Sequence, residues 1–379
     1  MRIEKIYFNT EDNTELFGLL HTSENQTDKE VVIAIHGMGS NCFKQRDDII
    51  AQKLTSNNIS YFSFNNRGFG LVNKITKNGS GILQGTAFED VKDSYYDIVS
   101  AIKLMASKGY EKIHLQGHSL GSTKSVYVYN KLLQNNETEI LNKISSVILL
   151  SLVDLTSVMQ FLVKNSDEDV IKIAKEKEAE KQLNYIIDCK ASFLPLVSVQ
   201  TFLTYYRDNK EIDFAKYQEK NYKFEKLNNI KVPLFMRWGN VNEIINLPAN
   251  ELVNLMNEKI LNNKKDINFI DGATHNYRGK EYGLRREEGE YIHTGDSVGV
   301  VMDTTKGELS FVLNGVNLGV AYEGVPLDMP LVPCVILYYY GNSVELDTSE
   351  VKEKVNNSIP VPSDITTKNT TWDSITLSW

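Results

Sequence analysis

Residues 112–121 form the stretch from which the rest of the fold can be worked out: Lys112-Ile113-His114-Leu115-Gln116-Gly117-His118-Ser119-Leu120-Gly121. The first part alternates apolar and polar residues, as a strand does, and a helical pattern follows over Ser122–Leu133. Between them lies a G-x-S-x-G motif. A strand and a helix crowd this turn, so its glycines leave room where a Cβ would collide. The pattern predicts a sharp strand–turn–helix unit that exposes the Ser119 hydroxyl above the end of a sheet.

Composition limits the classes of protein that this chain can represent. The 379 residues carry a net charge of −8, which argues against nucleic acid or an anionic membrane as a partner. Three cysteines lie far apart, at Cys42, Cys189 and Cys334, so we expect reduced thiols in a cytoplasmic protein rather than disulfides or a metal site. We find no signal-peptide core at the N-terminus and no apolar run near the roughly 20 residues that span a membrane.

The first 150 residues alternate between strand and helix patterns. An antiparallel hairpin is predicted over Ile3–Asn9 and Glu15–His21. The buried strands expected after it are Val31–Ile35, Ile59–Phe64, Ile113–Leu115 and Ile144–Ser151, with a helix over Phe43–Asn57 between the first two. This alternation predicts βαβ units and a mainly parallel sheet, whose ligands bind at the carboxyl ends of the strands.

Three local predictions concern the segments around this sheet. Asn73–Gly85 is expected to be a polar loop. Thr86-Ala87-Phe88-Glu89 matches a capping box, with apolar spacing behind it that predicts a helix through Met105. Val170–Asp188 is predicted to be a charged helix with a solvated face.

Residues 154–229 interrupt the sheet pattern, which resumes at Val232–Trp238 and Ile267–Ile270 around a helix over 246–261. An insertion at this place is where a lid would cover the Ser119 turn. Its aromatic residues either line an acyl pocket or pack in a core; they are Phe193, Phe202, Tyr205 and Tyr206.

The chain changes character after about residue 281. Asp296–Asp303, Glu308–Asn314 and Val316–Tyr322 alternate as strands, and Asn314-Gly315 is a strong hairpin turn. Two more strands are expected, at Leu331–Tyr340 and Ser343–Leu346. The sequence therefore predicts an all-β segment after the α/β part.

The first 280 residues resemble the alpha/beta-hydrolase superfamily. The resemblance rests on five stretches, which occur in the order typical of the family: His36-Gly37-Met38-Gly39, Asn66-Arg67-Gly68-Phe69-Gly70, Gly117-His118-Ser119-Leu120-Gly121, Trp238-Gly239 and Gly272-Ala273-Thr274-His275. It implies a serine hydrolase, similar to esterases, that needs no cofactor. We also find no metal-binding constellation and no phosphate-binding loop in the sequence.

A serine hydroxyl needs a base before it can attack an ester or amide at neutral pH. His275 is the candidate, because it follows a strand in a Gly-Ala-Thr loop where the superfamily places its histidine. The oxyanion of the intermediate needs two backbone N–H donors. We expect these from Leu120, directly after the serine, and from Met38, after His36-Gly37. His36 itself is expected to be structural.

The acid is the point at which this sequence departs from the superfamily. The usual aspartate position, three residues after Gly239, holds Asn242, and Glu243 follows it. An amide cannot stabilise an imidazolium, and in a known triad that change lowers the rate by about 10⁴. Glu243, Asn242 and Asp154 remain as alternatives for the third member.

Residues Tyr282–Leu346 resemble the C-terminal half of a SPRY domain, through Gly295-Asp296-Ser297-Val298-Gly299, Gly307-Glu308-Leu309-Ser310-Phe311 and Asn314-Gly315. This resemblance implies a protein partner. Residues 347–379 are expected to be a linker followed by the start of a fibronectin type III module, so the chain resembles a fusion or a broken gene model. Apolar side chains at Leu309, Phe311 and Leu313 are expected to lack a covering layer, and 350–379 to be disordered.

Two hypotheses follow from the sequence. The first is an intracellular serine hydrolase, favouring a carboxylesterase that acts on a small acyl ester or amide, although a peptidase, thioesterase or acyltransferase would share the same residues. The second is a non-enzymatic binding protein on a hydrolase scaffold, motivated by Asn242 and the SPRY-like segment.

Overall fold

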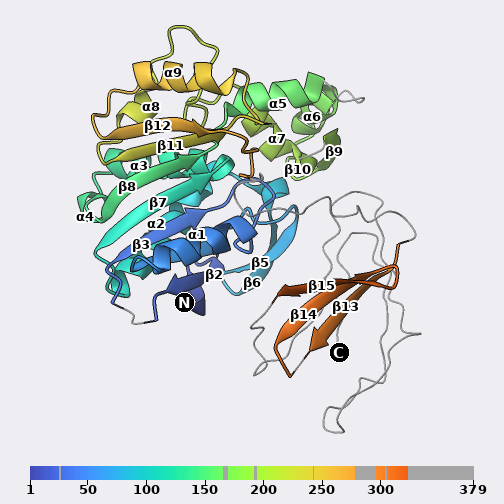
Figure 1. Cartoon of the computed structure of the whole chain (residues 1–379). Coiled ribbons are helices and arrows are strands. Elements are labelled where there is room, and N and C mark those ends of the chain that lie inside the picture. The colour runs from blue at the N-terminus through green and yellow to red at the C-terminus, as the bar shows by residue number, and fades with distance from the viewer. Residues whose placement is uncertain are drawn as a thin grey trace. The chain divides into compact units, whose positions relative to one another are not determined.

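The computed structural model describes residues 1–24, 27–164, 170–191, 194–241, 243–277, 296–303 and 305–322. The chain divides into two compact units, Met1–Arg286 and Glu287–Trp379 (Figure 1). Within the described part of the chain, no helix is long and apolar enough to cross a membrane.

The first unit is built on an eight-stranded sheet with the order β1-β2-β4-β3-β7-β8-β11-β12. These strands are β1 (Arg2–Asn9), β2 (Glu15–Thr22), β3 (Glu30–Ile35), β4 (Ile59–Asn65), β7 (Lys112–His118), β8 (Ile144–Leu150), β11 (Leu234–Gly239) and β12 (Lys265–Ile270). The first three strands in that order pair antiparallel and all later pairs are parallel. The predicted opening hairpin and mainly parallel sheet are confirmed.

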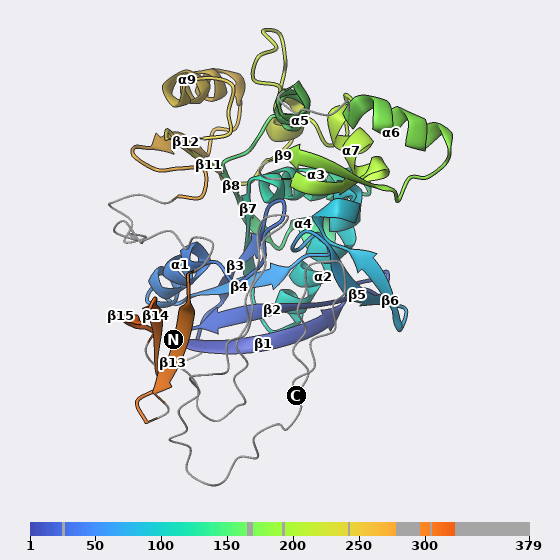
Figure 2. The same ribbon diagram turned by 90° about the vertical axis from the view of Figure 1, so that its right-hand side faces the viewer.

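Helices cover both faces of this sheet, which Figure 2 shows with α1 (Gln45–Thr55) on one side and α2 (Ser94–Ser107) and α3 (Leu120–Gln134) on the other. The second face holds the larger core, because β-branched and leucine side chains of the parallel strands are buried there under α2, α3 and α9 (Ala249–Lys259). The smaller helices of this part are α4 (Thr138–Leu141) and α8 (Glu225–Asn228).

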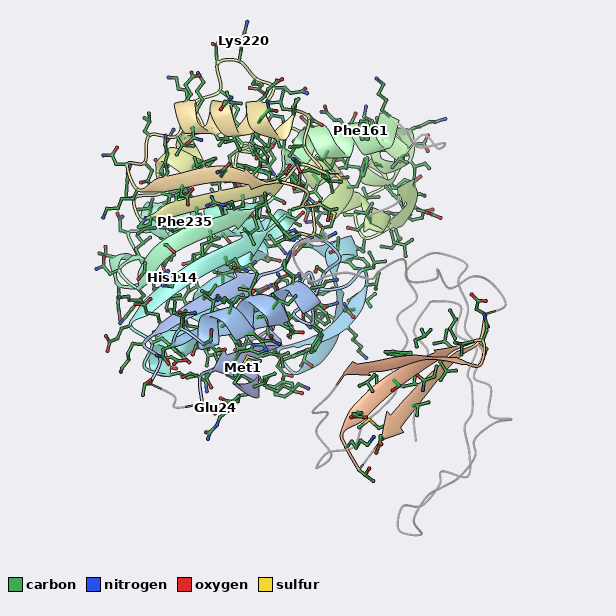
Figure 3. The ribbon with its side chains drawn as sticks, viewed as in Figure 1. Met1, Glu24, His114, Phe161, Lys220 and Phe235 are labelled. Carbon is green, nitrogen blue, oxygen red and sulfur yellow. The ribbon has the colours of Figure 1, made fainter. Side chains whose placement is uncertain are left out.

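The face that carries α1 holds a smaller apolar cluster, which contains Val32, Ala34, Ala51 and Tyr61. His114 on β7 lies in register with Val32, which packs near α1, and Figure 3 labels His114 and Phe235 along this side of the sheet. Phe235 on β11 is 37% exposed, so the α1 face of β11 is open to solvent there.

The segment between β8 and β11 folds as a cap. It contains α5 (Leu155–Lys164), α6 (Val170–Ala179), β9 (Ile186–Ala191), β10 (Leu194–Ser198) and α7 (Val199–Tyr206). These elements share an apolar cluster of their own, separate from the main core. Phe202 and Tyr205 are fully buried in it, so packing accounts for both of them, while Phe193 lies outside the described residues.

The structure corrects three local predictions. The predicted loop at 73–85 is a hairpin of β5 (Asn73–Lys77) and β6 (Ser80–Gln84). Its strands pair five residues with five across the turn at Asn78-Gly79, where both residues take positive φ. Sequence periodicity missed it because the strands are polar and short.

The predicted capping box is also wrong. Thr86 donates its hydroxyl to the Gly68 carbonyl instead of capping a helix, and only the short turns η1 (Thr86–Phe88) and η2 (Val91–Asp93) precede α2. Glu89 is free to turn inward, toward α3. The third correction is the charged helix: α6 stops at Ala179, and β9 begins at Ile186.

The second unit contains an antiparallel meander of β13 (Val298–Asp303), β14 (Glu308–Leu313) and β15 (Val316–Tyr322). Asn314 and Gly315 have φ of 50° and 82°, as a type I′ turn requires. Leu313 is buried, whereas Val300 and Leu318 are 53% and 62% exposed. The strands predicted at 331–340 and 343–346, the linker and the fibronectin-like start lie outside the described residues.

Candidate active site

Ser119 occupies the turn between β7 and α3, where its backbone takes φ 56° and ψ −123°. A Cβ on Gly121 would stand 2.1 Å from the Ile35 carbonyl oxygen, and one on Gly117 would stand 2.3 Å from the Gly121 oxygen. Real atoms do not approach so closely, so both positions need glycine. The turn therefore holds Ser119 in a strained conformation at the carboxyl end of β7 and the N-terminus of α3.

The turn after β3 lies directly against this serine. A Cβ on Gly37 would stand 2.9 Å from Ser119 Cβ and 3.4 Å from the Leu120 nitrogen. The structure thus brings together the two segments from which we expect the oxyanion donors Met38 and Leu120. His36 forms the base of this turn, and its side chain is buried.

The hydrogen bonds of His36 define its tautomer. The Asn66 backbone N–H donates to Nε2 at 3.2 Å, so Nε2 carries no proton, and Nδ1–H donates to the Gly37 carbonyl at 2.9 Å. Burial and the nearby Lys124 ammonium lower the pKa of His36 to about 3, so the ring stays neutral. Because a trans peptide is planar, fixing the Gly37 carbonyl also fixes the opposite direction of the Met38 N–H.

His275 follows β12, and its Nδ1 contacts Glu243 Oε1. The Glu243 side chain is only 2% exposed. It accepts three further hydrogen bonds, from the Gly239 N–H at 2.8 Å, the Ser151 hydroxyl at 2.8 Å and the Ile244 N–H at 3.0 Å. Burial raises the pKa of Glu243, but the hydrogen bond and charge of His275, with these donors, outweigh it and hold the pKa below its usual value.

His118 links His275 to the serine turn. Its Nε2–H donates to the His275 carbonyl at 2.7 Å, and the two rings lie 5.1 Å apart. Burial lowers the pKa of His118 well below its usual value, so it acts as a neutral donor. Among the described residues, Ser119 Oγ makes no hydrogen bond to His275; such contacts are often long in a ligand-free site.

The structure describes two of the three candidates for the acid, Glu243 and Asp154. Glu243 contacts His275, whereas Asp154 accepts a hydrogen bond from the Ser157 N–H at 3.1 Å, at the start of α5, and has no contact with His275. Asn242 lies outside the described residues. The structure therefore brings Glu243 alone of the two described candidates to the histidine.

Sequence reasoning missed several residues around the site. Ser151 holds Glu243, and a buried ion pair joins Lys124 on α3 to Glu89. A lysine in the otherwise small and apolar run after Gly121 was the available signal for the pair. Ser151 had no signal beyond its place at the end of β8.

The cap packs onto the predicted oxyanion residues. Leu120 belongs to the cap's apolar cluster, with Leu155, Met159 and Val199. Met38 packs against this cluster. Apolar side chains therefore surround one side of the Ser119 turn. No group of side chains in the described ranges could hold a metal ion.

The first unit has the alpha/beta-hydrolase fold. An alpha/beta hydrolase, GrgF, from Penicillium sp. sh18 superposes with a TM-score of 0.50 at 14% identity, over 73% of this chain and 91% of that chain. A soluble variant of monoglyceride lipase from Saccharomyces cerevisiae, in complex with a substrate analogue, gives 0.49 at 16% identity, over 73% and 88%. At these identities the likeness concerns the fold.

A second comparison concerns the later part of the chain. The SPRY domain model matches residues 254–350. This range starts before the predicted Tyr282 and includes the end of α9. It also includes β12, which pairs in the eight-stranded sheet, and His275, which follows β12. No curated protein matches the chain by sequence.

Proposed function

We propose that the chain is a serine hydrolase, favouring carboxylic esters, with Ser119 as nucleophile, His275 as base and Glu243 as the acid. The contact between His275 Nδ1 and a buried, ionised Glu243 carries the proposal. A carboxylate in this place keeps the proton on Nδ1 and leaves Nε2 able to accept one. It also stabilises the imidazolium that forms when Ser119 gives up its proton.

The proposed reaction has two halves. Ser119 Oγ attacks the acyl carbon while His275 takes its proton, and the oxyanion accepts hydrogen bonds from the Met38 and Leu120 N–H groups. Collapse breaks the ester bond, and His275 returns the proton to the leaving alcohol. Water then attacks the acyl-enzyme in the same way, which releases the acid and frees Ser119.

The apolar side chains around Met38 and Leu120 support an ester with an apolar acyl group. A peptidase, a thioesterase and an acyltransferase would use the same residues, so substrate panels must separate these activities. Esters of different chain length, thioesters and peptide amides should be compared on the same enzyme preparation.

Labelling with a fluorophosphonate probe tests the proposal. We expect covalent labelling of the whole chain, and its loss in Ser119→Ala. Ser107→Ala, at the end of α2, is the matched control and should label normally. A folded chain that is not labelled and hydrolyses none of the substrates would contradict the proposal.

The match to the SPRY model favours a second candidate, a protein-binding scaffold. SPRY domains are protein-interaction modules, and the antiparallel meander exposes apolar side chains. A scaffold would fold and bind a protein while remaining unlabelled by the probe. A protein partner and an esterase activity are also compatible in one chain.

A further inference from the structure

A lysine is buried in the helix that follows Ser119. Lys124 on α3 has no exposed surface, and its Nζ contacts the carboxylate of Glu89, which is 2% exposed. The same Nζ donates to Asn66 Oδ1 at 3.0 Å. A buried ion pair is a weak source of stability, because an apolar pair of similar size does as well or better. Its role therefore lies elsewhere than in stability.

The hydrogen bonds lead from Lys124 to the turn after β3. Asn66 Oδ1 accepts the hydrogen bond from Lys124 Nζ. The Asn66 backbone N–H donates to His36 Nε2 at 3.2 Å, and Asn66 Nδ2 donates to the His36 carbonyl at 3.4 Å. His36 in turn holds the Gly37 carbonyl, and through that peptide plane the direction of the Met38 N–H. One continuous set of buried polar contacts thus joins Lys124 to the proposed oxyanion donor.

The other end of the ion pair meets the cap. Thr201 on α7 donates its hydroxyl to the Glu89 carbonyl at 3.1 Å, and the Tyr205 hydroxyl lies 3.5 Å from Glu89 Oε2. Both side chains are buried. A Cβ on Gly68 would stand 1.8 Å from Glu89 Oε1, so the loop after β4 also leaves room for this carboxylate.

We infer that Lys124 and Glu89 are positioning residues for the proposed hydrolase. The pair holds Asn66 and His36 so that the Met38 N–H stays directed at the oxyanion, and Glu89 ties this arrangement to the cap helix α7. Lys124 extends from α3 to Asn66 Oδ1, which the Gly68 N–H also contacts at 3.1 Å, and so adds a charged donor to this turn. This inference rests on the proposed function.

Variants that neutralise both Lys124 and Glu89 distinguish a positioning role of the pair from a stabilising role. Lys124→Met alone leaves a buried carboxylate unpaired and should lower the melting temperature. Adding Glu89→Gln removes that charge, so the double variant should recover most of the melting temperature. It still lacks the Lys124 donor, so Asn66 Oδ1 keeps only the hydrogen bond from the Gly68 N–H at 3.1 Å. We expect kcat to stay about 10- to 100-fold low with KM nearly unchanged, since an oxyanion contact acts in the transition state.

Two further variants complete the experiment. Leu132→Ala, a core truncation at the far end of α3, is the control that lowers the melting temperature without changing kcat. Asn66→Ala should reproduce the loss of kcat while leaving the Lys124–Glu89 pair in place. It provides the test of the inference if the double variant does not fold.

The outcomes are distinct. A double variant with both melting temperature and kcat restored, or an Asn66→Ala variant with normal kcat, would show that the pair is only structural and overturn the inference. Failure of the proposed function would appear earlier, as a wild-type chain that the fluorophosphonate does not label, and would overturn both.

Discussion

At the scale of single residues, Glu243 illustrates how neighbours outweigh burial. Its carboxylate is removed from water, yet two backbone N–H groups nearby in the chain, the Ser151 hydroxyl and His275 keep it ionised. An ionised carboxylate is what the proposed reaction requires beside His275, because it favours the imidazolium in the transition state.

Glu243→Gln should lower kcat by about two to four decades, since an amide cannot stabilise the imidazolium and can hold the wrong tautomer. Steady-state kinetics on the best ester measures this. Asn242→Asp is the matched control and should change little. Strong activation by Asn242→Asp together with a silent Glu243→Gln would mean that residue 242 is the acid position and that the natural site is degraded.

Asp213, which lies in the segment between β8 and β11, should lower the stability of the folded protein at neutral pH. Burial raises its pKa to about 6, and the opposing Thr156 hydroxyl and Lys216 ammonium do not overcome it. Between roughly pH 4 and 6 the folded state holds more protons than the unfolded state, so stability falls as pH rises through this window.

Asp213→Asn should therefore raise the free energy of unfolding at pH 7.5, by on the order of 1–3 kcal/mol, with no gain at pH 4. Urea unfolding at both pH values is the measurement. Glu251→Gln, at an exposed carboxylate on α9, is the control. A loss of stability at pH 7.5 that exceeds any loss at pH 4 would show that the charged form of Asp213 is needed.

At the scale of elements, the β7–Ser119–α3 unit depends on contact between backbones. Gly121→Ala would press a methyl group into the Ile35 carbonyl, which cannot move without breaking β3 from the sheet. We expect a loss of more than about 3 kcal/mol and no probe labelling, measured by thermal unfolding and fluorophosphonate.

Gly272→Ala provides the comparison for that prediction. Gly272 has φ of 73° but open space around its Cβ position, so only backbone strain of about 1–2 kcal/mol applies. Equal losses at positions 121 and 272 would contradict the steric account of the Ser119 turn.

At the scale of the whole molecule, the SPRY match begins at residue 254 and so overlaps the end of α9 and β12, which belong to the first unit. The first unit extends to Arg286 and includes β12 and His275. A chain ending at Arg286 should therefore fold and keep its ester hydrolysis, if the proposed function holds.

A chain ending at Val253 should fail to fold, because it loses β12, part of α9 and His275. Circular dichroism and probe labelling of the two truncated chains measure the difference. Cooperative unfolding of the 1–253 chain would mean that residues 254–286 are not part of the hydrolase sheet.

Features that depend on local pattern could be predicted from the sequence. Alternating and continuous apolar runs predicted the strands of the sheet, the G-x-S-x-G stretch predicted the Ser119 turn, and Asn314-Gly315 predicted the hairpin of the second unit; the structure contains all three. These features are local because φ, ψ and side-chain alternation act within a few residues.

Which distant side chains meet depends on the three-dimensional packing of the chain. Spacing from Gly239 left Glu243, Asn242 and Asp154 as alternatives for the acid, and the loop after β11 brings Glu243 to His275 across 32 residues. A capping rule assigned Glu89 to a helix start, whereas burial against Lys124 prevails in the folded chain. A buried charge must find its partner wherever the fold provides one, and no local pattern records that partner.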